Sequence, residues 1–205
     1  MDLAVTLATF AVILPVELPD KTFVATLVLA TRYRPLPTWI GVGLAFGVQS
    51  LVAVTFGGLI ARLPERPVTL VAGLLFAVGA VVLWRGAAKA DEEEVETENE
   101  FEGKLRTGVH GLRAVGASFL VLFVAEWGDL SQLLTAGLVV RYKDPVSVFV
   151  GAWAALLLIS GIGALLGRAL LARMRLSTVR RIGGGVCAVL AAVTLLAAAG
   201  VPTPF

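Results

Sequence analysis

The chain has 205 residues, of which 58% are hydrophobic and only 16% are charged, with a formal net charge of +2. Its mean hydropathy of +0.89 is far above that of an ordinary soluble domain. The composition is that of an integral membrane protein, and no nucleic-acid partner is expected.

Six apolar runs are each long enough to cross a hydrocarbon core of about 30 Å as a helix. They cover residues 3–30, 38–61, 68–87, 112–140, 146–171 and 178–200. Core helices of a soluble protein would need polar faces at helical spacing, and the runs 68–83 and 186–199 have almost none. The sequence therefore predicts an all-α integral membrane protein with six transmembrane helices.

The distribution of Lys and Arg predicts the orientation of these helices. Twelve of the seventeen basic residues fall in segments on one side of the membrane, four fall on the other side, and Lys21 lies within the first run. Under the positive-inside rule this bias places both termini outside. The first apolar run is too long for a cleavable signal peptide and follows no basic region. We expect a multi-pass protein of a bacterial cytoplasmic membrane.

Residues 91–102, "DEEEVETENEFE", contain eight of the fifteen acidic residues of the chain. A run with so little apolar content is typical of a solvated, disordered segment. It predicts a cytoplasmic linker, residues 91–107, between a first half at 1–90 and a second half at 108–205. An alternative role for this acidic run is to collect cations before transport.

The two halves repeat a motif. The segment "FAVILPVELPDKTFVATLVLATRYRP" at 10–35 aligns with "FLVLFVAEWGDLSQLLTAGLVVRYKD" at 119–144 with a constant offset of 109 residues. Each half has three predicted spans, an odd number, so the halves would face opposite ways across the membrane. The predicted fold is a 3+3 inverted-topology repeat.

Each copy of the motif contains an E-x-x-D pair, Glu17 with Asp20 and Glu126 with Asp129, near the middle of a predicted span. Residues three apart lie on one face of a helix, so we expect the two acids of each pair to point the same way. An acid at a helix centre costs about 2.5 to 3.5 kcal/mol on insertion scales. Lys21 alone cannot neutralise four acids by structural ion pairing, which indicates a functional site.

The neighbouring residues favour a cation site built from oxygen atoms. Pro15, Pro19 and Gly128 predict helices that are bent or locally unwound beside the acids. No histidine or cysteine lies near, and carboxylate, hydroxyl and amide oxygens suit hard cations such as Mn²⁺, Ca²⁺ and Mg²⁺. The accessory residues expected to serve metal binding or proton coupling are Lys21, Thr22, Ser131 and Gln132.

Two other functions use the same acids. An exporter of amino acids or organic cations would bind an ammonium group there, normally with aromatic walls, but Trp127 is the only aromatic residue inside either motif. An intramembrane aspartyl protease would use Asp20 and Asp129 as a dyad, which leaves the paired glutamates without a role. We expect no enzymatic activity and no cofactor.

The motifs "ELPDKT" at 17–22 and "EWGDLS" at 126–131 resemble the signature of uncharacterised protein family 0016, the transmembrane protein 165-like cation/proton exchangers. That signature is E-x-G-D-[KR]-[TS], once in each half of a six-span inverted repeat; here Pro19 replaces the glycine and Leu130 the basic residue. The resemblance implies a secondary antiporter that exchanges Mn²⁺, or Ca²⁺, for protons. It also implies that the four metal ligands are Glu17, Asp20, Glu126 and Asp129.

Overall fold

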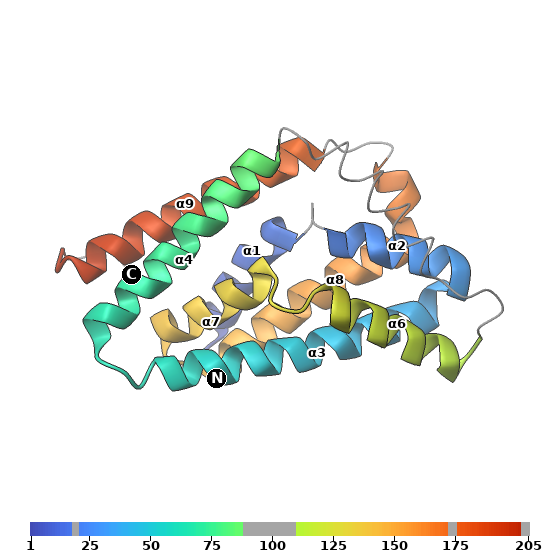
Figure 1. Ribbon diagram of the computed structural model, residues 1–205, viewed down its shortest axis with the longest axis horizontal. Coiled ribbons are helices and arrows are strands. Elements are labelled where there is room, and N and C mark those ends of the chain that lie inside the picture. The colour runs from blue at the N-terminus through green and yellow to red at the C-terminus, as the bar shows by residue number, and fades with distance from the viewer. Residues whose placement is uncertain (18–20, 88–109, 172–175, 202–205) are drawn as a thin grey trace.

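The computed structural model describes residues 1–17, 21–87, 110–171 and 176–201 (Figure 1). Every regular element within these residues is a helix, which confirms the all-α class. The helices are α1 (Leu3–Glu17), α2 (Lys21–Tyr33), α3 (Pro35–Ile60), α4 (Glu65–Gly86), α6 (Leu112–Ala125), α7 (Leu130–Tyr142), α8 (Pro145–Leu171) and α9 (Leu176–Ala198).

Four helices contain stretches that are long and apolar enough to cross a membrane, in α3, α4, α8 and α9. The pair α6 and α7 makes a fifth candidate span if the two bent helices are counted as one, while α1 is a shorter apolar helix. The first predicted span is divided between α1 and α2, and residues 18–20 between them lie outside the described part. The count of six spans therefore stays a prediction, and the predicted acidic linker also lies outside the described residues.

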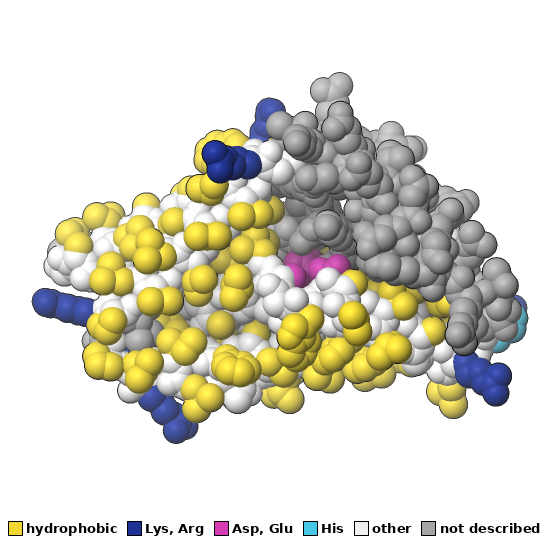
Figure 2. Space-filling view, viewed as in Figure 1, with side chains coloured by type: hydrophobic (Ala, Val, Ile, Leu, Met, Phe, Trp, Pro, Cys, Tyr) yellow, Lys and Arg dark blue, Asp and Glu magenta, His cyan; other side chains and the backbone are white. Residues whose placement is uncertain are grey.

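The surface of the molecule is apolar, as expected for contact with lipid. On α4, large hydrophobic side chains such as Leu74, Val78 and Val82 are each more than half exposed. Figure 2 shows hydrophobic side chains over much of the described surface in view, with Lys and Arg at its periphery. A soluble protein rarely exposes so large a continuous apolar area. The exposed surface of these helices therefore supports a membrane-embedded chain.

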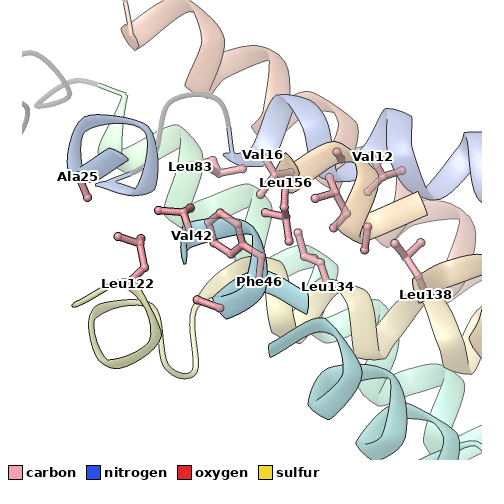
Figure 3. Close-up of a cluster of buried hydrophobic side chains, with 14 of the residues drawn as sticks. Val12, Val16, Ala25, Val42, Phe46, Leu83, Leu122, Leu134, Leu138 and Leu156 are labelled. Carbon is pink, nitrogen blue, oxygen red and sulfur yellow. The ribbon is translucent and has the colours of Figure 1, made fainter. Parts of the chain in front are cut away.

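The two short helices, α2 and α7, form the interior. Residues 23–30 of α2 are all buried, and so is most of α7. Figure 3 shows side chains from both helices, among them Ala25 and Leu134, converging with Phe46 of α3 and Leu156 of α8. The second helices of the two predicted interrupted spans thus lie at the centre of the bundle, and the long helices pack around them.

Helices α3 and α8 cross the centre in opposite directions and are joined by two reciprocal hydrogen bonds. The indole Nε1 of Trp39 donates to the carbonyl oxygen of Leu157 at 2.9 Å, and Nε1 of Trp153 donates to that of Gly43 at 2.8 Å. Since the lower-numbered residue of α3 pairs with the higher-numbered residue of α8, the helices are antiparallel. Each indole N–H thereby has an acceptor, which matters because an unpaired donor is costly in an apolar medium.

Two further pairings set the directions of the remaining helices. Gly73 of α4 faces Leu195 of α9, whereas Gly184 of α9 faces Ala80 of α4, so α4 and α9 are also antiparallel. Helix α1 and then α2 lie along α8 in the same direction as α8. There a Cβ added to Gly151 would lie 2.9 Å from that of Thr9 in α1.

Candidate functional site

A connection between α6 and α7 interrupts a predicted span in the middle of the molecule (Figure 1). Helix α6 ends at Ala125, α7 begins at Leu130, and their axes differ by 74°. Gly128 makes the turn with a φ of +80°, a conformation that favours glycine. The predicted bend is therefore confirmed in this half. Backbone groups freed inside a bilayer need new partners, which the nearby polar side chains provide.

The connection lies alongside the middle of α3. Gly41 of α3 approaches α6 so closely that an added Cβ would be 2.9 Å from the Cβ of Ser118. Gly57, further along α3, approaches α7 equally closely at Ala136. The residues between Ser118 and Ala136 therefore pass the central part of a helix that is long enough to cross the membrane.

Asp129 is the N-cap of α7. Its Oδ1 accepts a hydrogen bond from the backbone N–H of Gln132 at 3.0 Å, and its Oδ2 accepts one from the hydroxyl of Ser131 at 2.8 Å. A carboxylate at a helix N-terminus is stabilised by the free N–H groups and by the helix dipole. These two bonds fix the direction of the carboxylate. A carboxylate held in this way presents oxygen atoms, the kind of ligand that hard cations bind.

The side-chain amide of Gln132 joins the two sides of the connection. Its Nε2 donates to the carbonyl oxygen of Glu126 at 2.6 Å, and its Oε1 accepts from the backbone N–H of Gly128 at 3.3 Å. Sequence reasoning included Gln132 as an accessory metal or coupling residue. In the structure its amide replaces backbone hydrogen bonds that the helix loses here.

The sequence leaves two roles open for Gln49, a place at the site or a hydrogen bond between helices, and the structure shows the hydrogen bond. Gln49 lies near the middle of α3, is 2% exposed, and donates from Nε2 to the carbonyl oxygen of Phe123 at 3.2 Å. This carbonyl is in the last turn of α6, where the helix no longer supplies a partner. The only sequence signal was a glutamine in an apolar run, which helix–helix hydrogen bonding explains equally well.

The two glutamates that the motif predicts are buried. Glu17 is the last residue of α1 and is 0% exposed, while Glu126 is the C-cap of α6 and is 5% exposed. Figure 2 shows acidic side chains in a hollow at the middle of the molecule. Glu126 and Asp129 do not share a helical face, contrary to the sequence-based expectation. They flank the interruption instead, because the helix ends between them.

The rest of the predicted set can be followed only in part. Asp20 lies outside the described residues, as do the side chains of Lys21 and Thr22. Among the described His, Cys, Asp and Glu residues, no three gather into a group that could hold a metal ion. The ligand role of the four acids therefore stays a prediction. The structure does bring together Glu126, Asp129, Ser131 and Gln132.

Leu130, which occupies the position of the family's basic residue, packs away from this connection. Its Cδ1 would lie 3.3 Å from a Cβ added to Gly79 of α4, and the sulfur of Cys187 in α9 lies at 3.5 Å from the same point. Position 130 is therefore part of the contact between α7 and the α4–α9 pair. A basic side chain there would enter an apolar contact.

An interrupted helix inside an apolar bundle, with carboxylates at the interruption, defines the class of secondary membrane transporters that bind ions at broken helices. The chain belongs to the GDT1 family, described as "Divalent cation/proton antiporter GDT1", whose model matches residues 5–91 and 114–201. The resemblance seen in the two motifs is thereby confirmed, and the family is one of transporters, not of enzymes.

Relatives from bacteria and plants match most of this chain. It is 33% identical over 178 residues to "GDT1-like protein sll0615" of Synechocystis sp., covering 82% of this chain and 85% of the relative. It is 29% identical over 198 residues to the "Putative manganese exporter" of Vibrio cholerae, covering 94% and 89%. It is 32% identical over 211 residues to "Protein PAM71, chloroplastic" of Arabidopsis thaliana, covering 92% and 55%. No solved structure matches this chain.

Proposed function

We propose that this chain exchanges a divalent cation for protons at the α6–α7 interruption and its counterpart in the first half. The observation that carries this proposal is the oriented carboxylate of Asp129, beside the buried Glu126, inside an apolar bundle. A carboxylate in such a place needs either a proton or a cation. Metal binding displaces protons from carboxyl groups, so the two ions compete for one site and antiport follows.

The cation that we favour is Mn²⁺, with Ca²⁺ as second choice. Carboxylate and hydroxyl oxygens at the site are hard ligands, which suit both ions and do not distinguish them. The name of the Vibrio relative, with 94% of this chain aligned, supports manganese. In a bacterial cytoplasmic membrane the expected direction is export, driven by protons that flow inward.

The fold that we propose is a six-span 3+3 inverted repeat, in which α1 with α2 and α6 with α7 each form one interrupted span. Two findings support it. The stretches that match the family model begin 109 residues apart, and the equivalent helices α3 and α8 are antiparallel, as are α4 and α9. One half rocking against the other would expose the site alternately to each side. The bias of basic residues supports termini on the outside.

In this scheme the four motif acids bind the metal, and Lys21 balances part of their charge. Ser131 orients Asp129, with Thr22 as its counterpart in the first motif. Gln132 acts on the metal through the backbone that it holds. No described contact favours an exporter of organic cations, since Trp127 is 57% exposed and its ring packs at a tilt against Phe123, with centroids 4.9 Å apart.

The test is metal uptake into proteoliposomes with an acidic interior. Mn²⁺, Ca²⁺ and Mg²⁺ are supplied outside in parallel runs, while a metal-sensitive and a pH-sensitive dye report both fluxes. We expect Mn²⁺ entry coupled to loss of internal protons, and neither flux in Asp129→Asn. Asp144→Asn, an acid outside the bundle, serves as the matched control. If no divalent ion moves in the wild-type protein, the proposal is wrong.

A further inference from the structure

A cavity of about 220 Å³ lies where α7 and α9 end and α4 begins, away from the acidic connection. Its polar lining consists of Thr69, Arg141, Lys143 and Thr194. At about 30 Å³ per water molecule, a space of this size could hold several waters or one small polyatomic ion. The cavity therefore has the dimensions of a binding site and is larger than an ordinary packing defect.

The lining is basic. A second cavity, of about 440 Å³, lies beside it between α3 and α7 and adds Arg62, and Lys143 lines both. No acidic residue is among the described residues that line either cavity. The nearest acid in sequence, Asp144, accepts hydrogen bonds from Ser147 at the start of α8. Three cationic side chains around two adjoining cavities would repel a divalent cation and attract an anion.

Arg141 is held so that part of its guanidinium has no partner. One Nη donates to the hydroxyl of Thr194 at 2.9 Å, and the guanidinium carbon lies 5.8 Å from the centroid of the Tyr142 ring. The Nε atom is buried and makes no hydrogen bond among the described residues. A buried donor of this kind is costly unless a ligand oxygen satisfies it. Guanidinium groups present several donors in one plane, a geometry that suits phosphate oxygens.

A simpler reason for a basic residue at this position is the end of α7, because a cation complements the C-terminus of a helix. That reason accounts for the charge of Arg141. It does not account for the cavity or for the two threonine hydroxyls.

The cavity also lies at the depth of lipid headgroups. Thr69 begins the apolar stretch of α4 and Thr194 is in the last turns of α9, so the lining marks the boundary of the candidate spans. Arg and Lys side chains near the ends of transmembrane helices reach the headgroup region, where lipid phosphate groups lie. Inorganic phosphate from the aqueous side presents the same oxygen atoms.

We propose that this cavity binds a phosphate group through Arg141 and Lys143, supplied by an anionic lipid headgroup or by free phosphate. The inference does not depend on which cation is transported. The expected consequence is that a phosphate-bearing ligand joins α7, which follows the candidate metal site, to the α4–α9 pair.

The experiment measures binding of the purified full chain in detergent to three probes. They are phosphatidylglycerol, phosphatidylcholine and inorganic phosphate, each followed by native mass spectrometry and by the shift in melting temperature. Arg141→Gln is compared with Arg85→Gln, which removes an exposed arginine from the last turn of α4 and so matches the change in charge. Lys143→Gln is a second test if Arg141→Gln does not fold.

We expect phosphatidylglycerol or inorganic phosphate to bind the wild-type protein and Arg85→Gln alike. Binding to Arg141→Gln should be weaker by about tenfold or more, the scale of a lost charge-assisted hydrogen bond. Competition of inorganic phosphate with the lipid would identify the free anion as a source, and lipid binding without competition would identify the headgroup; either supports the proposal. Equal binding to Arg141→Gln and to the wild-type protein would overturn it, as would no preference for either anionic probe over the zwitterionic phosphatidylcholine.

Discussion

The two halves of the molecule use matching acids but support them differently. Glu17 ends α1, Glu126 follows α6, and the helices that come next in the chain, α2 and α7, each have 13 residues. At the position of Gln132, however, the first half has Phe23, 109 residues earlier. Gln132 bonds to the backbone on both sides of its connection, whereas Phe23 is 2% exposed and lies against Gly163 of α8.

The long helices α3 and α8 also differ in the hydrogen bonds that their polar side chains make. Helix α3 supplies Gln49, which donates to the end of α6. Near the equivalent place in α8, Ser160 donates to Leu157 of its own helix. The side-chain amides of Gln49 and Gln132 therefore hold the α6–α7 connection. The related residues for the first half, Ser160 and Phe23, have no side-chain amide. The comparison indicates two halves with the same pair of acids and unequal support around them, which matters because cation selectivity depends on how rigidly the ligands are held.

The largest effect is expected from neutralising the motif acids one at a time, which tests whether the acids of the two halves have equal roles. Glu17→Gln, Asp20→Asn, Glu126→Gln and Asp129→Asn should each reduce Mn²⁺/H⁺ exchange in proteoliposomes to the level of empty liposomes. Each substitution removes a charge that the metal needs and that the surrounding apolar helices cannot replace. Circular dichroism should show unchanged helix content. Wild-type flux in Glu126→Gln would contradict the equal roles of the two halves.

The difference in hydrogen-bond support between the two halves can be tested at the paired positions 23 and 132. Gln132→Met keeps the size of the side chain but removes both amide hydrogen bonds, so the backbone at Glu126 and Gly128, between the two acids, loses its support. We expect the apparent affinity for Mn²⁺ to fall by about ten- to a hundredfold, the usual range for residues that orient metal ligands. Phe23→Met, a swap of one apolar residue for another, is the matched control and should change the affinity much less.

The measurement is the dependence of flux on Mn²⁺ concentration, which separates KM from the maximal rate. A rise in KM with a nearly unchanged maximal rate is expected for Gln132→Met, since the loss is in the geometry of the bound ion. Equal changes in Gln132→Met and Phe23→Met would mean that the halves do not differ in the proposed way.

A smaller effect is expected at Gln49. Gln49→Leu leaves the carbonyl of Phe123 without its hydrogen bond in the interior of the bundle, a loss of about 1 to 3 kcal/mol in folding free energy. We expect a lower melting temperature. We also expect the KM for Mn²⁺ to rise by at most about tenfold, because the end of α6 becomes less ordered. Ser160→Ala, at the related place in α8, should leave both quantities close to the wild-type values. If Ser160→Ala lowered the melting temperature as much as Gln49→Leu does, the hydrogen bond of Gln49 would not distinguish α3 from α8.

The sequence predicts best those features of the fold and the site that depend on residues close together in the chain. The all-helical class, the repeat of the acids and the bend at Gly128 follow from composition, spacing and one flexible residue. The shared helical face of Glu126 and Asp129 was wrong, because the spacing rule assumes a continuous helix and the bend ends the helix between them. Gly128 predicts a bend between the two acids, and a bend there is incompatible with a shared helical face.

What the sequence could not predict are the contacts between distant segments. Gln49 meets Phe123 across 74 residues, and the reciprocal bonds of Trp39 and Trp153 span more than a hundred. A polar residue in an apolar run has many possible partners until the helices are placed. Leu130 is a further example: its motif position suggested the charge cluster, but the rotation of α7 turns it toward Gly79 of α4.

The smallest expected difference between the halves lies where α3 and α8 begin. Helix α3 follows Arg34, which has a φ of 77° and provides no side-chain cap, whereas α8 follows Asp144. The hydroxyl of Ser147 and then its backbone N–H, at 3.1 Å, donate to the Asp144 carboxylate and hold its pKa below the ordinary value of 3.8. A lowered pKa means that the folded protein binds this proton less readily than the unfolded chain.

The stabilisation by Asp144 is therefore fully present above the ordinary pKa of 3.8 and is lost as the pH falls below it through the lower folded value. We expect Asp144→Ala to lower the melting temperature slightly at about pH 7 and to make no difference at a pH well below the folded pKa. Ser147→Ala should lower the melting temperature less, because the backbone N–H still donates. Mn²⁺ flux at neutral pH should not change in either variant, since neither side chain bonds to the α6–α7 connection in the described residues. A gap in melting temperature that stays constant down to the acid limit would show that the carboxylate charge does not stabilise the start of α8.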